Sequence, residues 1–279
     1  VGESMSIEKR GYGTILVATL GGLGAVSAGL AGDFLPWRMA FIGAGIIGFL
    51  LLLIRVKSIE TGIFKATQST STQKGSLKLL FQNKKRTFKY IACILMGVPI
   101  WFSVGLLITL TPELAKEHQL PMVQLGLCFI LFQTGITSGD LSSGIISQWI
   151  KSRKKALLMF MGIAIIGTIF HFNQLYNSLS LYPTSFLMGL GCGYLSVFVT
   201  STAEHFGTNL RVTVTATVTN FMRGAVTLLI PFRIFIQQNF QTSITESLIV
   251  TGTIVWILAL SAVIILPDTY GKDLNFVEE

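Results

Sequence analysis

Residues 203–224 read AEHFGTNLRVTVTATVTNFMRG, a stretch that begins with charged and polar side chains and continues as an apolar helical pattern. Arg211 lies near its polar start, and Arg223 follows twelve residues later. Because a helix rises about 1.5 Å per residue, the two arginines are about 18 Å apart along the axis. If Arg211 marks a membrane surface, Arg223 lies more than halfway into a hydrocarbon core of about 30 Å. An ionisable side chain at that depth is a candidate functional group.

The composition of the whole chain is that of a membrane protein. Of its 279 residues, 51% are hydrophobic and only 12% are charged, whereas a soluble chain has about 25% charged residues. Apolar runs long enough to span a bilayer as helices recur, and they lack the short alternating pattern of barrel strands. The sequence therefore predicts an all-α polytopic membrane protein with eight transmembrane helices, at residues 13–32, 37–55, 90–111, 121–149, 155–172, 182–202, 211–237 and 247–266.

The charge distribution divides the chain and orients it. Between Arg55 and Lys89 there are nine Lys and Arg residues and one acidic residue, which indicates a basic linker at residues 56–88. We expect residues 1–55 to end an N-terminal bundle and residues 89–279 to form a six-helix bundle with a short tail. Seventeen of the 21 basic residues fall on the linker's side of the membrane. The positive-inside rule then places both termini in the cytoplasm, and we assign the chain to the plasma (inner) membrane. The same distribution explains the net charge of +8 without nucleic acid as a partner.

Asp140 and Arg223 are the two ionisable residues predicted to lie near mid-membrane, at similar depth on the two most polar helices. Two interpretations are open: a fixed structural ion pair, or a site in which Arg223 receives an anionic substrate group while Asp140 is its counter-ion or a titrating coupling group. Four polar side chains that share these two helix faces are further candidates for substrate binding, although hydroxyls can also bond their own backbone: Gln133, Thr137, Thr219 and Asn220.

The sequence lacks the residue groups of an enzyme or a metal site. The three cysteines lie singly in apolar runs, which indicates free, buried side chains, and the three histidines are scattered. No nucleophile, base and orienting group can be placed together. Gly189, Gly191 and Gly193 resemble a nucleotide loop but lie in a membrane helix, where we expect them to pack against other helices. We therefore expect no catalytic residue, no metal and no cofactor.

Three motifs carry a resemblance to a known family. Residues 203–211, AEHFGTNLR, are similar to AExFPTxLR, residues 267–274, PDTYGKDL, are similar to PETKGxxL, and residues 144–156, GIISQWIKSRKKA, resemble a degenerate GxxxDRxGRRK. On these motifs the chain resembles the major facilitator superfamily, in the branch of sugar and organic-ion transporters, which often carries an arginine at the position of Arg223. Gln148 stands where the loop motif has aspartate, and Gly207 replaces the proline of FPT.

The resemblance implies that the chain corresponds to family helices five to twelve, with the first four missing. It implies a secondary active transporter that moves a small organic solute by alternating access within the lipid bilayer, with proton coupling and the oligomeric state left open. Arg223 favours an organic anion such as a carboxylate over a neutral sugar or an organic cation. The alternative from another class is a membrane-embedded receptor or enzyme. The resemblance also implies charge pairs that latch a cytoplasmic gate, where solvated anchoring charges are the competing interpretation, at Glu204, Arg211, Arg153 and Lys154.

Overall fold

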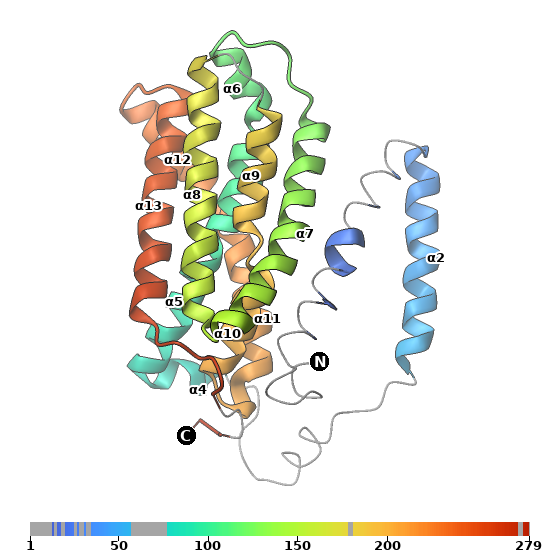
Figure 1. Ribbon diagram of the computed structural model, residues 1–279, viewed down its shortest axis with the longest axis vertical. Coiled ribbons are helices and arrows are strands. Elements are labelled where there is room, and N and C mark those ends of the chain that lie inside the picture. The colour runs from blue at the N-terminus through green and yellow to red at the C-terminus, as the bar shows by residue number, and fades with distance from the viewer. Residues whose placement is uncertain are drawn as a thin grey trace.

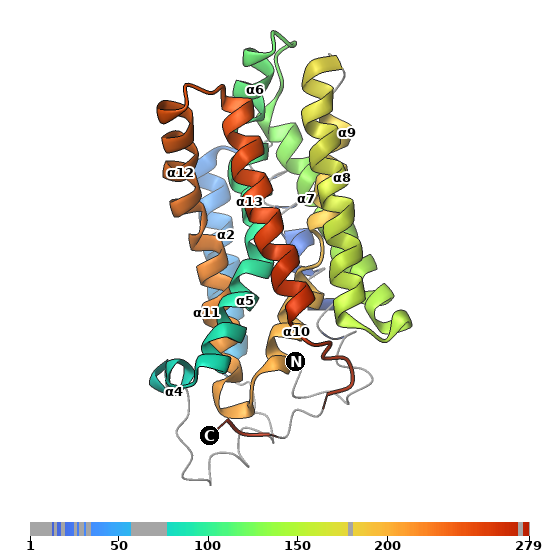
Figure 2. The same cartoon turned by 90° about the vertical axis from the view of Figure 1, so that its left-hand side faces the viewer.

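The computed structural model is a bundle of roughly parallel helices (Figures 1 and 2). It describes residues 13, 16–17, 20–24, 27, 31, 35–56, 77–177, 181–272 and 276–278, and no strand occurs among them. The helices are α2 (Trp37–Val56), α4 (Leu77–Gln82), α5 (Lys84–Phe102), the π-helix η2 (Ser103–Ile108), α6 (Thr111–Glu117), α7 (Leu125–Ile150), α8 (Arg153–Asn177), α9 (Tyr182–Cys192), α10 (Leu195–His205), α11 (Thr208–Gly224), α12 (Val226–Asn239) and α13 (Ile244–Ile265).

The bundle has two ends, the Arg153 end and the Glu117 end. At the Arg153 end, α7 gives way to α8, α10 gives way to α11, and α13 ends. At the Glu117 end lie α6 and the connection from α12 to α13 (Figure 1). Each long helix therefore runs from one end to the other, as expected for segments that cross a membrane.

Within the described residues, five helical segments are long and apolar enough to cross a membrane. They are Trp37–Ile54, Lys84–Ile108, Arg153–Leu175, Tyr182–His205 and Ile244–Ile265. The helix α7 packs against α8 and α9 but carries amide, hydroxyl and carboxylate side chains, whereas α2 stands apart from these helices (Figure 1). The α11–α12 pair likewise carries polar side chains and contains three arginines. These more polar helices are the two on which the sequence places its candidate site.

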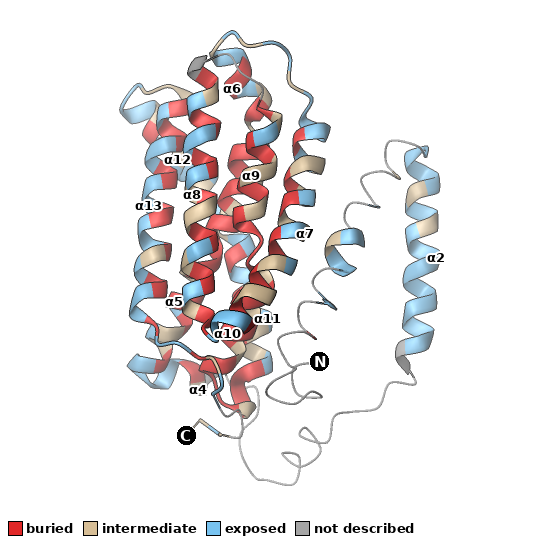
Figure 3. Ribbon diagram, in the orientation of Figure 1, coloured by how far each residue is buried: buried red, intermediate tan, exposed pale blue. Residues whose placement is uncertain are grey.

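Burial separates helices of the bundle interior from helices of its periphery (Figure 3). In the spans Lys84–Ile108 and Tyr182–His205, 67% of the most apolar window is buried, against 44% in Arg153–Leu175 and in Ile244–Ile265. Large apolar side chains of α8 and α13, such as Ile169 and Ile257, are more than half exposed. Since these helices belong to a membrane protein, their exposed apolar faces are suited to contact with lipid.

The helix α5 begins with a side-chain cap and ends in an irregular turn. The side chain of Asn83 accepts a hydrogen bond of 2.9 Å from the Lys85 backbone N–H, which satisfies one of the free donors at the helix start. Pro99 lies inside the helix and removes a backbone donor. The chain continues as the π-helix η2, and the hydroxyl of Thr109 donates to the carbonyl of Val104 at 2.9 Å. The proline is thus followed within one turn by a change of helix type.

Glycines bring α7 and α9 into backbone contact. A Cβ atom built on Gly139 would lie 2.1 Å from the Leu190 carbonyl oxygen, and one on Gly189 would lie 2.1 Å from that of Phe132. One on Gly193 would lie 2.5 Å from the Ile136 carbonyl oxygen. No side chain fits at these positions, so the packing role expected for the glycines of residues 189–193 is confirmed.

Several predicted boundaries are wrong. The expected helix at 182–202 is two helices, because the chain breaks at Gly193 and Tyr194, and the expected helix at 211–237 is divided at Ala225. The last part of the expected linker is helical, since α4 begins at Leu77 and α5 at Lys84. Residues 57–76 of that linker lie outside the described residues. Of the expected helix at 13–32, each position that is described is helical.

Candidate functional site

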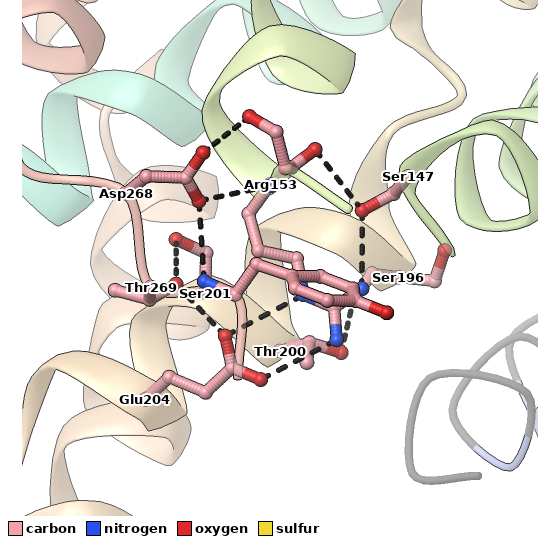
Figure 4. A network of polar contacts seen from close by, with 10 residues as sticks. Ser147, Arg153, Ser196, Thr200, Ser201, Glu204, Asp268 and Thr269 are labelled. Carbon is pink, nitrogen blue, oxygen red and sulfur yellow. Dashed lines mark hydrogen bonds and ion pairs between the residues drawn. The ribbon is translucent and has the colours of Figure 1, made fainter. Parts of the chain in front are cut away.

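A buried ion pair joins α8 to α10 at the Arg153 end (Figure 4). Nη2 of Arg153, the first residue of α8, lies 3.4 Å from Oε1 of Glu204 in the last turn of α10, and Nε lies 3.5 Å from Oε2. Both side chains are about 95% or more shielded from solvent. Removing one partner would leave an uncompensated buried charge, so the pair fixes the two helix ends to each other strongly.

Neighbouring side chains complete the hydrogen bonding of this pair. Nη1 of Arg153 donates to Oγ of Ser147 at 3.0 Å, and the hydroxyl of Thr269 donates to Oε2 of Glu204 at 2.8 Å. The guanidinium also lies over the ring of Tyr270, with Cζ 5.0 Å from the ring centroid. Residues from α7, α8, α10 and the segment after α13 therefore meet in one charge network.

Asp268 holds the start of α8 in the same network. Its carboxylate accepts hydrogen bonds from the hydroxyl of Ser152, from the backbone N–H of Arg153 at 3.0 Å and from that of Tyr270 at 3.1 Å. An acidic group at a helix N-terminus is also favoured by the helix dipole. Burial raises the pKa of the Asp268 carboxyl, but the hydrogen bonds outweigh burial and hold this pKa below its ordinary value. Asp268 is therefore a charged partner of the network at neutral pH.

The other two predicted gating residues bind carbonyl groups at helix ends. Nζ of Lys154 donates to the carbonyl oxygens of Ile264 and Leu266 at the end of α13. Nε of Arg211 donates to the carbonyl of Ala203 near the end of α10, at 3.1 Å. Both arrangements place a cation at a helix C-terminus, where the dipole stabilises it. Of the four residues, Arg153 and Glu204 thus form the ion pair, while Lys154 and Arg211 tie together adjoining helix ends.

Sequence reasoning missed four members of the network as functional candidates, although signals for them were present. Asp268, Thr269 and Tyr270 lie in PDTYGKDL, which had been noted for its family resemblance without a contact to residue 153. Ser147 lies two helical turns after Asp140, on the same polar face. The sequence does not show that the segment after α13 folds back to contact the start of α8, where Asp268 bonds Ser152 and Arg153.

Asp140 is buried in the bundle and caps the helix that follows the break at Gly193. Its Oδ1 accepts a hydrogen bond of 2.6 Å from the backbone N–H of Ser196 in the first turn of α10. In return, the hydroxyl of Ser196 donates to the Asp140 carbonyl at 3.3 Å. The exposed fraction of Asp140 is 3%. Its carboxylate thus satisfies a backbone donor that the broken span leaves free.

Arg223 lies on α11 with its side chain exposed and its guanidinium over the ring of Trp101. Cζ of Arg223 is 4.8 Å from the centroid of that ring, a cation–π geometry. Nε1 of Trp101 is buried without a hydrogen-bond partner within the described part of the chain. The arginine therefore rests on an aromatic surface of α5 with no carboxylate beside it among the described residues.

Of the two interpretations left open for Asp140 and Arg223, the fixed ion pair is not formed in this structure. Asp140 points into the start of α10, whereas Arg223 contacts Trp101 on α5, and the ion pairs found among the described residues are Arg153–Glu204 and Arg86–Glu278. Equal depth along two helices does not determine which way each side chain points around its axis.

The four polar candidates beside these charges mostly bond their own helices. The hydroxyls of Thr137 and Thr219 donate to carbonyls four residues earlier, at 3.0 Å and 2.9 Å, and Nδ2 of Asn220 donates to Ala216 at 2.9 Å. Gln133 is half-buried and supplies the carbonyl that Thr137 contacts. Each hydroxyl or amide oxygen keeps acceptor capacity for another group.

Taken together, the helical bundle, its apolar spans and its buried charges define an all-α polytopic membrane protein across the described residues. The sequence model of the Major Facilitator Superfamily matches residues 1–231, which is most of the chain. The chain belongs to this superfamily and is an integral membrane transporter of that kind. Among curated proteins, none matches the chain.

Proposed function

We propose that this protein is a secondary transporter that moves a small organic anion, such as a carboxylate, by alternating access. The observation that carries the proposal is the environment of Arg223. Its guanidinium lies about 18 Å along the helix from Arg211 and has the Trp101 ring, and no carboxylate, as its described partner. Placing a cationic side chain in a membrane costs free energy. An anionic substrate in a water-filled cavity would offset this cost, which is the reason to expect one beside Arg223.

The geometry suits a planar anion. Trp101 covers one face of the guanidinium, which leaves its edge N–H groups available for a bidentate contact with a carboxylate. The oxygens of Thr219 and Asn220 are acceptors on the same helix and would take hydrogen bonds from hydroxyl or amine groups of the substrate. A substrate that combines a carboxylate with such donors fits this set.

We assign different roles to the polar residues of α7. Asp140 is engaged with α10, so we propose it as the group that couples a proton to movement of the broken span and not as a counter-ion to Arg223. Thr137 and Gln133 lie one and two turns before Asp140 on α7 and would extend the substrate-facing polar surface.

The Arg153–Glu204 network is proposed as the latch that closes one side of the transporter. The basic residues concentrated at the Arg153 end favour its location at the cytoplasmic surface, in the plasma (inner) membrane. Opening a passage there would separate α8 from α10 and break the ion pair, so the pair stabilises the state that is closed on that side.

The uptake test uses the full chain in proteoliposomes, with a panel of labelled carboxylates, neutral sugars and organic cations, with and without a pH gradient. We expect uptake of a carboxylate that both Arg223→Ala and Arg223→Lys abolish, since lysine cannot reproduce the bidentate contact. Arg233→Ala is the matched control, because Arg233 lies on the next helix and, within the part of the chain that the structure describes, bonds Gln237 one turn away. Carboxylate uptake that survives in both Arg223 variants, or uptake restricted to sugars or cations, contradicts the proposal.

The latch is tested separately by hydrogen exchange in the absence of substrate. Glu204→Gln should increase the exchange of backbone amides in α10 and the first turn of α8, because the buried pair no longer opposes local opening. Glu246→Gln at the opposite end is the control and should leave these amides unchanged. Equal exchange in the wild type and in Glu204→Gln would rule out the latch.

A further inference from the structure

An open groove lies at the Arg153 end between the start of α5 and the end of α13. These two helices pack side by side (Figure 2). The groove has a volume of about 410 Å³ and is lined by Lys84, Lys85, Phe88, Lys89, Ile265, Leu266 and Pro267. It contains none of the residues assigned above to substrate binding or to the latch. Its lining combines three ammonium groups with an apolar wall.

The three lysines of the groove have no counter-charge within the described residues. The ammonium groups of Lys84, Lys85 and Lys89 make no hydrogen bond or ion pair there, whereas Arg86 in the same turn is buried and bonds Glu278 at 3.1 Å. Lys85 and Lys89 are four residues apart, so they lie on one face of α5 and repel each other. An anion between them would relieve this repulsion.

The nearest acidic side chains on neighbouring elements are already engaged. Asp268, one residue after the groove wall, accepts hydrogen bonds from Ser152 and from backbone groups of α8, and Glu278 is held by Arg86. A further cation, Lys272, lies close enough to Lys89 that burial and the Lys89 charge together lower its pKa. The electrostatic field at the groove is therefore positive.

The other wall of the groove is apolar and open to the membrane. The side chains of Phe88 and Ile265 are 50% and 59% exposed. Both belong to the ends of apolar spans, Lys84–Ile108 and Ile244–Ile265, which would end at the level of the phospholipid headgroups. A ligand at this level that contacts both walls must have an anionic head and a hydrocarbon tail.

We propose that this groove binds an anionic glycerophospholipid, with the headgroup phosphate between Lys85 and Lys89 and an acyl chain along Phe88 and Ile265. Lys84, at the outer rim, adds positive charge. Basic residues at a membrane surface attract anionic lipid, and a groove with an apolar wall converts this attraction into a defined site. The bound lipid would lie beside the carbonyls of α13 that Lys154 holds, and thus next to the latch.

The test compares two double variants of the purified full chain in detergent. Binding of phosphatidylglycerol is measured by native mass spectrometry against phosphatidylcholine. Lys85→Gln/Lys89→Gln should weaken phosphatidylglycerol binding about tenfold or more, given the contribution of each lysine near an anionic lipid. The control Lys151→Gln/Lys155→Gln removes the same charge from exposed residues at the same end and should change binding less than about twofold.

Competition by soluble phosphates identifies the source of the anion, and a charge-conserving variant checks that the protein still folds. Glycerol 3-phosphate and inorganic phosphate should not displace the lipid, and Lys85→Arg/Lys89→Arg should retain binding with unchanged helical content by circular dichroism. Equal losses in both glutamine variants would show a diffuse basic surface. Displacement by soluble phosphate, or equal binding of phosphatidylcholine, would likewise overturn the site.

Discussion

The carboxylate of Asp140 accepts a hydrogen bond of 2.6 Å from the backbone N–H of Ser196 and so caps α10 from within α7. Ser196 directly follows the break at Gly193, in a span that would otherwise be a single helix from Tyr182 to His205, and Asp140 reaches it from the neighbouring helix α7. A buried break leaves backbone donors without partners, and each would cost free energy if left unpaired. The buried carboxylate of α7 thus has a defined structural partner, and this contact generates a direct test.

Asp140→Ala should lower the free energy of unfolding in detergent by about 1–3 kcal/mol, because it leaves the Ser196 N–H buried without an acceptor. Asp140→Asn keeps an acceptor oxygen and should cost less than Asp140→Ala. Ser142→Ala is the control, since Ser142 bonds only carbonyls of its own helix. Chemical denaturation followed by circular dichroism measures the differences. Equal losses for the alanine and asparagine variants would show that the cap is not what stabilises the break.

The backbone contact between α7 and α9 predicts a strong position dependence for glycine substitutions. Gly193→Ala would place a Cβ 2.5 Å from the Ile136 carbonyl oxygen, and we expect a loss of about 1–3 kcal/mol of stability. Gly162→Ala on α8 meets no atom within 4 Å and should be neutral or stabilising by up to about 1 kcal/mol. Thermal unfolding of the two variants provides the comparison. A tolerated Gly193→Ala would mean that the helices are not in contact as described.

The Glu117 end contains a pH-dependent contact. Glu117 accepts hydrogen bonds from the backbone N–H groups of Ile244 and Thr245, at 2.9 Å and 3.0 Å, and one of 2.6 Å from the Thr245 hydroxyl. Burial raises the pKa of the Glu117 carboxyl, but these hydrogen bonds outweigh burial and hold the pKa below its ordinary value of 4.5. A carboxyl whose folded-state pKa is depressed contributes stability above its unfolded pKa and loses it as the pH falls through the folded one.

We therefore expect Glu117→Gln to lower the midpoint of thermal unfolding at pH 7. This difference from the wild type should shrink as the pH falls below the ordinary value of 4.5. Unfolding at several pH values between 7 and about 3.5 measures the trend, in the range where a carboxyl titrates. Glu113→Gln on the same short helix is the control. A difference that stays constant over this range would contradict the assignment.

The buried pair at the Arg153 end should show strong coupling in a double-mutant cycle. Glu204→Leu and Arg153→Met, each alone, should cost about 3–5 kcal/mol, because each leaves the other charge buried without its partner. The combined variant should recover most of that loss, since an apolar pair can replace a buried ion pair with little change in stability. The cycle is read from chemical denaturation of the four proteins. Additive losses would show that the two side chains do not stabilise each other.

The sequence predicted the helical membrane class and the family, because apolar run length, charge distribution and short motifs are local properties. It also indicated correctly that Gly189, Gly191 and Gly193 pack against neighbouring helices. It did not predict the break at Gly193, because a glycine-rich apolar run is compatible with both a continuous and a divided helix. One donor freed by the break, the Ser196 N–H, is satisfied by Asp140, which is more than fifty residues away in the chain.

What the sequence by itself determined is position along a helix: the number of residues from a helix end gives the place of Asp140 and Arg223 along the helix axis. Only the tertiary structure determined which way each side chain points and which groups it contacts. It turned Asp140 toward Ser196 and Arg223 toward Trp101, and it brought Asp268 to the start of α8. The physical reason is that the rise along a helix is fixed by its backbone, whereas the rotation of each helix about its axis is set by packing against the others.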